Sequence, residues 1–236
     1  MSAAASGAET ETLSFAGRKL EFGGATRESE ERNVVALKLH TDRGDIDARF
    51  HPSADAAPAA KQLGVVWVGG AGGGLDGPAR GLYPAASEQL QQRGIASIRL
   101  HYRRPNELRD CVLDTLAGVA FLAREGVTKV ALVGHSFGGA VVISAGASSK
   151  NVKAVVPMSS QTYGTELTPA VAPRAMLLIH GTNDEVLPDA CSRQIYAAAG
   201  QPKEIKLYPG AGHGLDEVRQ EVLDLLVRWI PEQVAK

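Results

Sequence analysis

The chain has 236 residues, of which 44% are hydrophobic and 22% charged, and its formal net charge at pH 7 is −1. This size and composition are typical of one soluble globular domain that buries its core without disulfides or a metal. The balanced charge and the 5% content of aromatic residues argue against a nucleic-acid surface, and no apolar run approaches the roughly 18 residues of a membrane span.

The first residues, 1–12, are rich in Ala, Ser and Glu and lack the basic and apolar regions of a signal peptide. Their composition predicts a flexible N-terminus. Cys111 and Cys191 lie far apart in predicted helices, so we expect no disulfide framework. These features favour a reducing, cytoplasmic location.

An antiparallel hairpin is predicted near the N-terminus, where the strand-like residues 34–40 and 45–50 flank a polar turn. A loop rich in Ala and Pro follows over residues 53–60. From Val65 onward, short apolar strands alternate with helical stretches. The expected strands cover residues 65–68, 95–100, 130–133, 152–158, 175–179 and 204–208, and the expected helices cover residues 83–92, 107–124, 137–148, 189–199 and 215–234.

This alternation predicts an α/β fold. Strands that are apolar on both faces are typical of a mostly parallel sheet with helices on both sides. About fifteen residues separate the strand that ends near Ser159 from the strand that begins near Ala175, which is too few for a helical cap domain. We therefore expect a single domain over residues 13–236, with an N-terminal antiparallel hairpin and no large cap.

The segment from Gly134 to Gly138 has the pattern G-x-S-x-G, with Ser136 at its centre. An apolar strand precedes it and a helical stretch follows, which is the strand–turn–helix context of a nucleophile elbow. The two glycines are expected because a Cβ at either position would collide with the neighbouring strand or helix. The helix that follows would direct its N-terminal N–H groups toward developing negative charge.

The partners that such a serine needs follow in the expected order. Asp184 lies in a polar loop directly after a buried strand, and His213 lies in a glycine-rich loop after the next strand. We interpret His213 as the base that removes the Ser136 proton and Asp184 as the acid that orients His213. Glu185 and Asp189 are alternatives to Asp184, although Asp189 fits better as negative charge in the first turn of the next helix.

Five other histidines could compete with His213. His135 lies beside the nucleophile with its side chain directed away from Ser136, so we expect it to pack or to form hydrogen bonds. His180 ends a predicted strand and is interpreted as a core histidine with satisfied hydrogen bonds. The remaining three precede the serine motif and come in the wrong order: His40, His51 and His101. The spacing of histidines and cysteines does not indicate a metal site.

A glycine-rich loop over residues 69–74 follows the strand at residues 65–68. In this context the loop supplies one backbone N–H of an oxyanion hole, and the residue after the nucleophile supplies the second. The candidates are Phe137 and either Ala71 or Gly70. Residues 72–77 also match the dinucleotide motif G-x-G-x-x-G, but the next strand ends without the acid that would hold a ribose. No cofactor is therefore expected.

The segments GGAGGG, GHSFGG, HGTNDEVLP and PGAGHG together resemble the α/β-hydrolase superfamily, from about Val34 to the C-terminus. The short gap before Ala175 is similar to the capless dienelactone-hydrolase-like and small serine esterase branches. Two features depart from the family pattern: Ser136 stands where dienelactone hydrolases usually carry cysteine, and Gly69-Gly70 stands where the oxyanion loop often has His-Gly.

The resemblance implies hydrolysis through an acyl-enzyme, with a small-molecule carboxylic ester as the commonest substrate. Thioesterase, amidase or small peptidase activity with the same residues remains an alternative, as does a ligand receptor or scaffold that no longer catalyses. Without a cap, loops must form the substrate pocket. The candidates are Leu75, Tyr102, Gln161, Tyr163, Leu187 and Leu215. Arg103 and Arg104 could face an anionic substrate group or form structural ion pairs.

Overall fold

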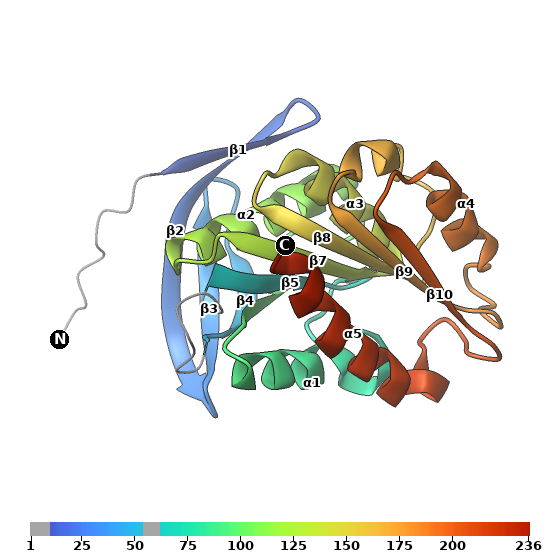
Figure 1. Ribbon diagram of the computed structural model, residues 1–236. Helices are drawn as coiled ribbons and strands as arrows, with labels where there is room; N and C mark the ends of the chain where they lie inside the picture. Colours follow the sequence, from blue (N-terminus) through green and yellow to red (C-terminus); the bar gives the residue numbers. More distant parts are fainter. Residues whose placement is uncertain (1–9, 54–61) are drawn as a thin grey trace.

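The computed structural model describes residues 10–53 and 62–236, and in this part of the chain ten strands form one sheet (Figure 1). The strand order is β1-β2-β3-β4-β6-β5-β7-β8-β9-β10. The strands are β1 (Glu11–Phe15), β2 (Arg18–Glu31), β3 (Val34–Thr41), β4 (Ile46–His51), β5 (Leu63–Val68), β6 (Ala96–His101), β7 (Lys129–His135), β8 (Val152–Met158), β9 (Ala175–Gly181) and β10 (Lys203–Tyr208).

The six strands from β6 to β10 in this order are parallel to one another, as the sequence predicts. The central strands β5 and β7 are almost completely buried, because helices cover both faces of the sheet. This arrangement confirms the α/β-hydrolase fold that the sequence resembles. Parallel strands also place all of their carboxyl ends along one edge, which is where their loops can meet.

The N-terminal part of the sheet is antiparallel. The predicted hairpin forms between β3 and β4, with Val35 opposite Phe50 and Leu39 opposite Ile46. Two further strands, β1 and β2, extend it and were not predicted. Strand β1 begins at Glu11, inside the stretch expected to be flexible, and pairs with β2. Residues 1–9 of that stretch, and residues 54–60 of the predicted loop at 53–60, lie outside the described residues.

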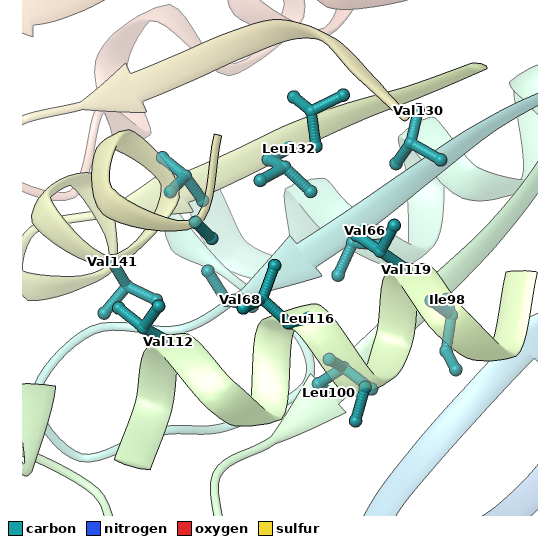
Figure 2. Packing of buried hydrophobic residues seen from close by; sticks show 14 of the residues in the cluster. Val66, Val68, Ile98, Leu100, Val112, Leu116, Val119, Val130, Leu132 and Val141 are labelled. Atoms are coloured by element: carbon teal, nitrogen blue, oxygen red, sulfur yellow. The ribbon is translucent and has the colours of Figure 1, made fainter. Parts of the chain in front are cut away.

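The helices form a layer on each face of the sheet (Figure 1). Helices α2 (Leu108–Arg124), α3 (Phe137–Ser148) and α4 (Ala190–Ala198) cover one face, and α1 (Pro78–Gln92) and α5 (Arg219–Val234) cover the other. Figure 2 shows how the apolar side of α2 packs: Leu116 and Val119 lie beside valine side chains of β5, and Val112 lies beside Val141 of α3. Burial of each such side chain stabilises the fold by about 1.5–3 kcal/mol.

The last helix differs from its predicted start at residue 215. Leu215 has a left-handed backbone (φ 56°), a short 3-10 turn follows over Asp216–Val218, and α5 begins at Arg219. The periodic apolar pattern includes Leu215 because its side chain is fully buried, although its backbone is not helical. The described residues between β8 and β9 form loops and the 3-10 helix η2 (Thr168–Val171), so the expected absence of a cap domain is confirmed there. None of the described helices could cross a membrane.

Candidate active site

Three polar residues singled out by the sequence lie just beyond the carboxyl ends of three parallel strands. Ser136 follows β7, Asp184 follows β9, and His213 follows β10. Since β7, β8, β9 and β10 are consecutive neighbours in the sheet, these residues lie along one stretch of the same edge. In open α/β sheets, this edge is where reactive groups are gathered.

The backbone at Ser136 is strained, with φ 58° and ψ −121° in a region that residues other than glycine rarely adopt. The surrounding backbone holds this conformation: the Ser136 N–H donates to the Met158 carbonyl over 2.8 Å, and the Gly139 N–H donates to the Ser136 carbonyl over 2.9 Å. A Cβ at Gly134 would collide with the Gly138 carbonyl, and one at Gly138 would collide with the Gly69 carbonyl. Both glycines are therefore required, as the sequence predicts.

Asp184 and His213 form a short hydrogen bond of 2.7 Å, which His213 donates through Nδ1 to Oδ2 of the carboxylate. The Asp184 side chain is fully buried, and that of His213 is 20% exposed. The other carboxylate oxygen accepts the N–H groups of Val186 and Leu187. Burial alone would raise the pKa of Asp184, but the hydrogen bonds from Leu187, His213 and Val186 outweigh it and hold the pKa below its usual value.

The alternatives to Asp184 lie elsewhere. Asp189 precedes the first residue of α4, close to its predicted place, and pairs with Arg193 over 3.0 Å. Glu185 is exposed to solvent. Of these three acids, Asp184 is the one that contacts His213.

His135 supports the loop that carries His213. Its Nε2 lies 2.8 Å from the His213 carbonyl oxygen, and the centroids of the two rings are 4.7 Å apart. Burial lowers the pKa of His135 to about 4, so its ring is neutral near pH 7, with Nε2–H as the donor. The expected hydrogen-bonding role of His135 is therefore confirmed, and its partner is the backbone of His213.

His180 is a fully buried histidine with all of its polar atoms paired, as the sequence interpretation expects. One of its partners is Asp184, whose Oδ2 lies 3.1 Å from Nε2. This contact was not predicted, because His180 lies in β9 and Asp184 in the loop after it, where a spacing of four residues does not indicate a contact.

The glycine loop after β5 is held by side chains that sequence reasoning missed. The Tyr83 hydroxyl donates to the Val68 carbonyl over 2.9 Å, and the Tyr102 hydroxyl donates to the Gly69 carbonyl over 3.1 Å. The Gly74 N–H donates to Nδ1 of His101. A Cβ built on Gly70 would lie 3.5 Å from Cβ of Ser136, so the loop passes directly beside the serine.

The residues expected to line a substrate pocket differ in exposure. Tyr163 is 75% exposed, whereas Tyr102 and Leu215 are 1% and 0% exposed and therefore offer little surface to a substrate. Three others are partly buried, namely Leu75, Gln161 and Leu187.

The two arginines after β6 take part in ion pairs. Arg103 binds the buried carboxylate of Asp114, and Arg104 lies 3.5 Å from that of Asp110. Both cysteines in the described residues are free, as expected. Within residues 10–53 and 62–236, no group of His, Cys, Asp and Glu side chains is arranged to hold a metal ion.

Comparison with known proteins supplies the family. Residues 79–225 match the dienelactone hydrolase family, and this segment contains Ser136, Asp184 and His213. The chain belongs to the dienelactone hydrolase family. It is thus an α/β hydrolase, in agreement with the resemblance of its motifs. No curated protein gives a significant match.

Solved structures share the fold of this dienelactone hydrolase family member at low sequence identity. The dienelactone hydrolase from Anabaena variabilis is 18% identical with a TM-score of 0.74, and the match covers 85% of this chain and 98% of the other. XC6422 from Xanthomonas campestris, a serine hydrolase without a lid, is 19% identical with a TM-score of 0.68, covering 86% and 97%. Est1E from Butyrivibrio proteoclasticus is 20% identical with a TM-score of 0.69, covering 85% and 99%.

Proposed function

We propose that this protein is a serine hydrolase that cleaves carboxylic esters of small molecules through an acyl-enzyme. The observation that carries the proposal is the 2.7 Å hydrogen bond between Asp184 and His213 on the same sheet edge as the strained Ser136. Because Nδ1 of His213 is committed to Asp184, Nε2 is the ring nitrogen available to Ser136.

In the first half of the reaction, His213 Nε2 takes the Ser136 hydroxyl proton while Oγ attacks the ester carbonyl. The tetrahedral intermediate then collapses, the C–O bond to the leaving alcohol breaks, and His213 returns the proton to the alcohol. In the second half, His213 removes a proton from water, and the hydroxide attacks the acyl-enzyme. The second tetrahedral intermediate collapses, the bond between the acyl carbon and Oγ breaks, and His213 gives its proton to Oγ, which releases the carboxylic acid and restores the Ser136 hydroxyl. Asp184 orients the His213 ring and stabilises its cationic form in both halves.

Two backbone N–H groups are proposed to bind the oxyanion of the intermediate. Phe137 is the first residue of α3 and directly follows Ser136, so its N–H has no acceptor within the helix and is available at the helix N-terminus. Gly70 forms a β-bridge with Gly73, in which the Gly73 N–H donates to the Gly70 carbonyl over 2.9 Å. The second donor is proposed to be the N–H of Ala71, with that of Gly70 as the alternative.

The choice of an ester is supported by a structural neighbour, the esterase domain of a Rhodothermus marinus protein, whose fold matches with a TM-score of 0.66. Est1E from Butyrivibrio proteoclasticus was also solved with ferulic acid bound. Thioesters or amides would undergo the same steps with a thiol or an amine as the leaving group, whereas a non-catalytic receptor would hydrolyse none of these substrates. Turnover of esters, thioesters and amides that carry the same acyl groups distinguishes these alternatives.

The proposal is tested with Ser136→Ala and p-nitrophenyl acetate. Loss of the nucleophile should reduce turnover by about 10⁶-fold, effectively to background, with the fold retained in circular dichroism. A fluorophosphonate probe should label the wild type and the control Ser149→Ala but not Ser136→Ala. Undiminished turnover in Ser136→Ala would refute the assignment, and a wild type that neither turns over esters nor reacts with the probe would indicate a scaffold.

A further inference from the structure

The fully buried His180 has a polar contact on each side of its ring. Nδ1 lies 2.7 Å from the Ser192 hydroxyl oxygen. Nε2 lies 3.1 Å from Oδ2 of Asp184 and 2.9 Å from the carbonyl oxygen of Leu187. The imidazole therefore connects β9, the loop after it and helix α4, since Ser192 belongs to α4.

The partners of His180 determine which nitrogen carries the proton. The carboxylate oxygen of Asp184 and the carbonyl oxygen of Leu187 can only accept, so Nε2 must donate to both. Nδ1 then has a free lone pair and accepts the Ser192 hydroxyl proton. The neutral Nε2–H form satisfies every polar atom of this buried ring.

The carboxylate of Asp184 is thereby surrounded by donors. Oδ2 accepts from both His213 and His180, and Oδ1 accepts from two backbone N–H groups. His180 donates to Oδ2, the oxygen that the two backbone N–H groups do not contact, and it shares this oxygen with His213. We propose that His180 is a positioning residue of this site, which holds Asp184 in place and limits how strongly Asp184 stabilises protonated His213.

This inference rests on the proposed roles of His213 and Asp184. Other titratable groups also face the pair: the His135 ring packs on His213, the Cys191 thiol lies in the field of Asp184, and the Glu217 carboxylate accepts the N–H of Gly212 beside His213. Substitutions at His180 leave all three in place. A change in pH dependence can then be attributed to the contact between His180 and Asp184.

The test uses two amides that each mimic one ring nitrogen. In His180→Gln, the side-chain amide reaches the position of Nε2 and can still donate to Asp184. In His180→Asn, the shorter amide reaches the position of Nδ1 and can contact Ser192, but it cannot reach Asp184. The two variants both carry a polar amide and differ by one methylene. A difference in activity between them therefore shows the effect of the hydrogen bond that residue 180 donates to Asp184.

We expect His180→Asn to lower kcat/KM by about 10–100-fold, the same range as for loss of a hydrogen-bonded residue that orients a metal-ligating side chain. The acid limb of its kcat/KM profile should move to higher pH, because a carboxylate with one donor fewer stabilises protonated His213 more strongly. His180→Gln should restore most of the activity and keep the wild-type limb. Ser192→Ala should have a smaller effect in the same direction, with Ser144→Ala, another buried serine, as its matched control.

A second readout does not depend on turnover. In ¹⁵N NMR of the resting protein, His180 should be the Nε2–H tautomer, and the titration midpoint of the His213 ring should rise in His180→Asn but not in His180→Gln. Identical profiles and midpoints for Gln, Asn and wild type would overturn the proposal and leave His180 as core filling. If ester turnover proves independent of Ser136 while the NMR midpoints shift, the proposed function fails and the positioning role stands.

Discussion

At the scale of single residues, the carboxylate of Asp184 is buried, and hydrogen-bond donors of the protein take the place of water around it. Its buried carboxylate accepts four hydrogen bonds, two from backbone N–H groups and two from histidine rings. A carboxylate with this many donors stays ionised. It can therefore hold the Nδ1–H tautomer of His213, which leaves Nε2 unprotonated and able to act as a base.

The tautomer predicts the effect of Asp184→Asn. The amide has the size of the carboxylate but can donate to Nδ1 of His213, which would place the ring proton on Nε2, where it blocks the transfer from Ser136. We expect kcat to fall by about 10⁴-fold with little change in KM. The control is Asp189→Asn, which loses an ion pair with Arg193 outside the site and should keep near wild-type activity. A similar loss in both variants would contradict the assignment.

At the scale of structural elements, the turn between β5 and α1 positions backbone atoms rather than side chains. Two tyrosine hydroxyls bind its first carbonyl groups, and a bridge between Gly70 and Gly73 closes it beside Ser136. Backbone donors fixed in this way need no reorganisation when negative charge develops. The rigidity of this turn is therefore part of the proposed catalytic machinery.

Replacing Ala71 by proline tests the turn directly, because it deletes the proposed donor and little else. Ala71 is not among the residues with positive φ, so its backbone does not exclude proline on that ground. We expect kcat to fall by about 10²–10³-fold in Ala71→Pro, the range for loss of one oxyanion donor. Ala71→Gly keeps the N–H and should stay near wild type. Equal kcat values for the two variants would return the assignment to Gly70.

The elements themselves were predictable to different degrees. The six parallel strands lie within two residues of their expected positions. Five of them, β5 to β9, are almost completely buried and mostly apolar, whereas the edge strand β10 is only partly buried and alternates in exposure. Strand β2 was missed because the part from Ala25 onward is mostly exposed and polar, and its hydrogen bonds to β3 are made by the backbone, which leaves no side-chain pattern. Sequence patterns detect burial, and this exposed part of β2 is held by backbone pairing with β3.

The candidate site was also predictable only in part. Ser136, Asp184 and His213 are recognisable because each follows a predicted strand, in a fixed order along the chain. The contacts of His180 with Asp184, and of Tyr83 and Tyr102 with the glycine turn, depend on how loops return across the sheet edge. Sequence spacing carries little information about such contacts, so the supporting contacts were not predicted, whereas the three proposed reacting residues follow from their order in the chain.

At the scale of the whole molecule, a second buried histidine couples pH to stability. His51 is 2% exposed and accepts a hydrogen bond from Arg99, which also binds the Leu75 carbonyl and Asp76. Burial, together with the charge of Arg99, lowers the pKa of His51 to about 4. The folded protein therefore resists protonation at a position where the unfolded chain, with its ordinary histidine pKa near 6.5, accepts it.

Linkage gives the sign of the effect. Between about pH 6.5 and pH 4 the unfolded state binds more protons at this position, so stability falls as pH falls through that window, by on the order of 3 kcal/mol. His51→Gln can still accept from Arg99 but does not titrate. The unfolding free energies of the wild type and of His51→Gln are to be measured in urea from pH 7 to pH 4. As pH falls, the wild type should lose more stability than His51→Gln. Parallel curves would contradict a neutral buried His51.

The outer edge of the sheet has a consequence for the protein in concentrated solution. Strand β1 pairs with β2 only as far as Phe22, so within the described residues the rest of β2 has a partner on the β3 side alone. An open strand edge invites another chain to add on and begin aggregation. Here that edge carries Arg27, Glu28, Glu30 and Glu31. Two copies that approach edge to edge would bring their acidic residues together, and these like charges repel one another. The polar residues that kept β2 from being predicted therefore also disfavour intermolecular strand pairing.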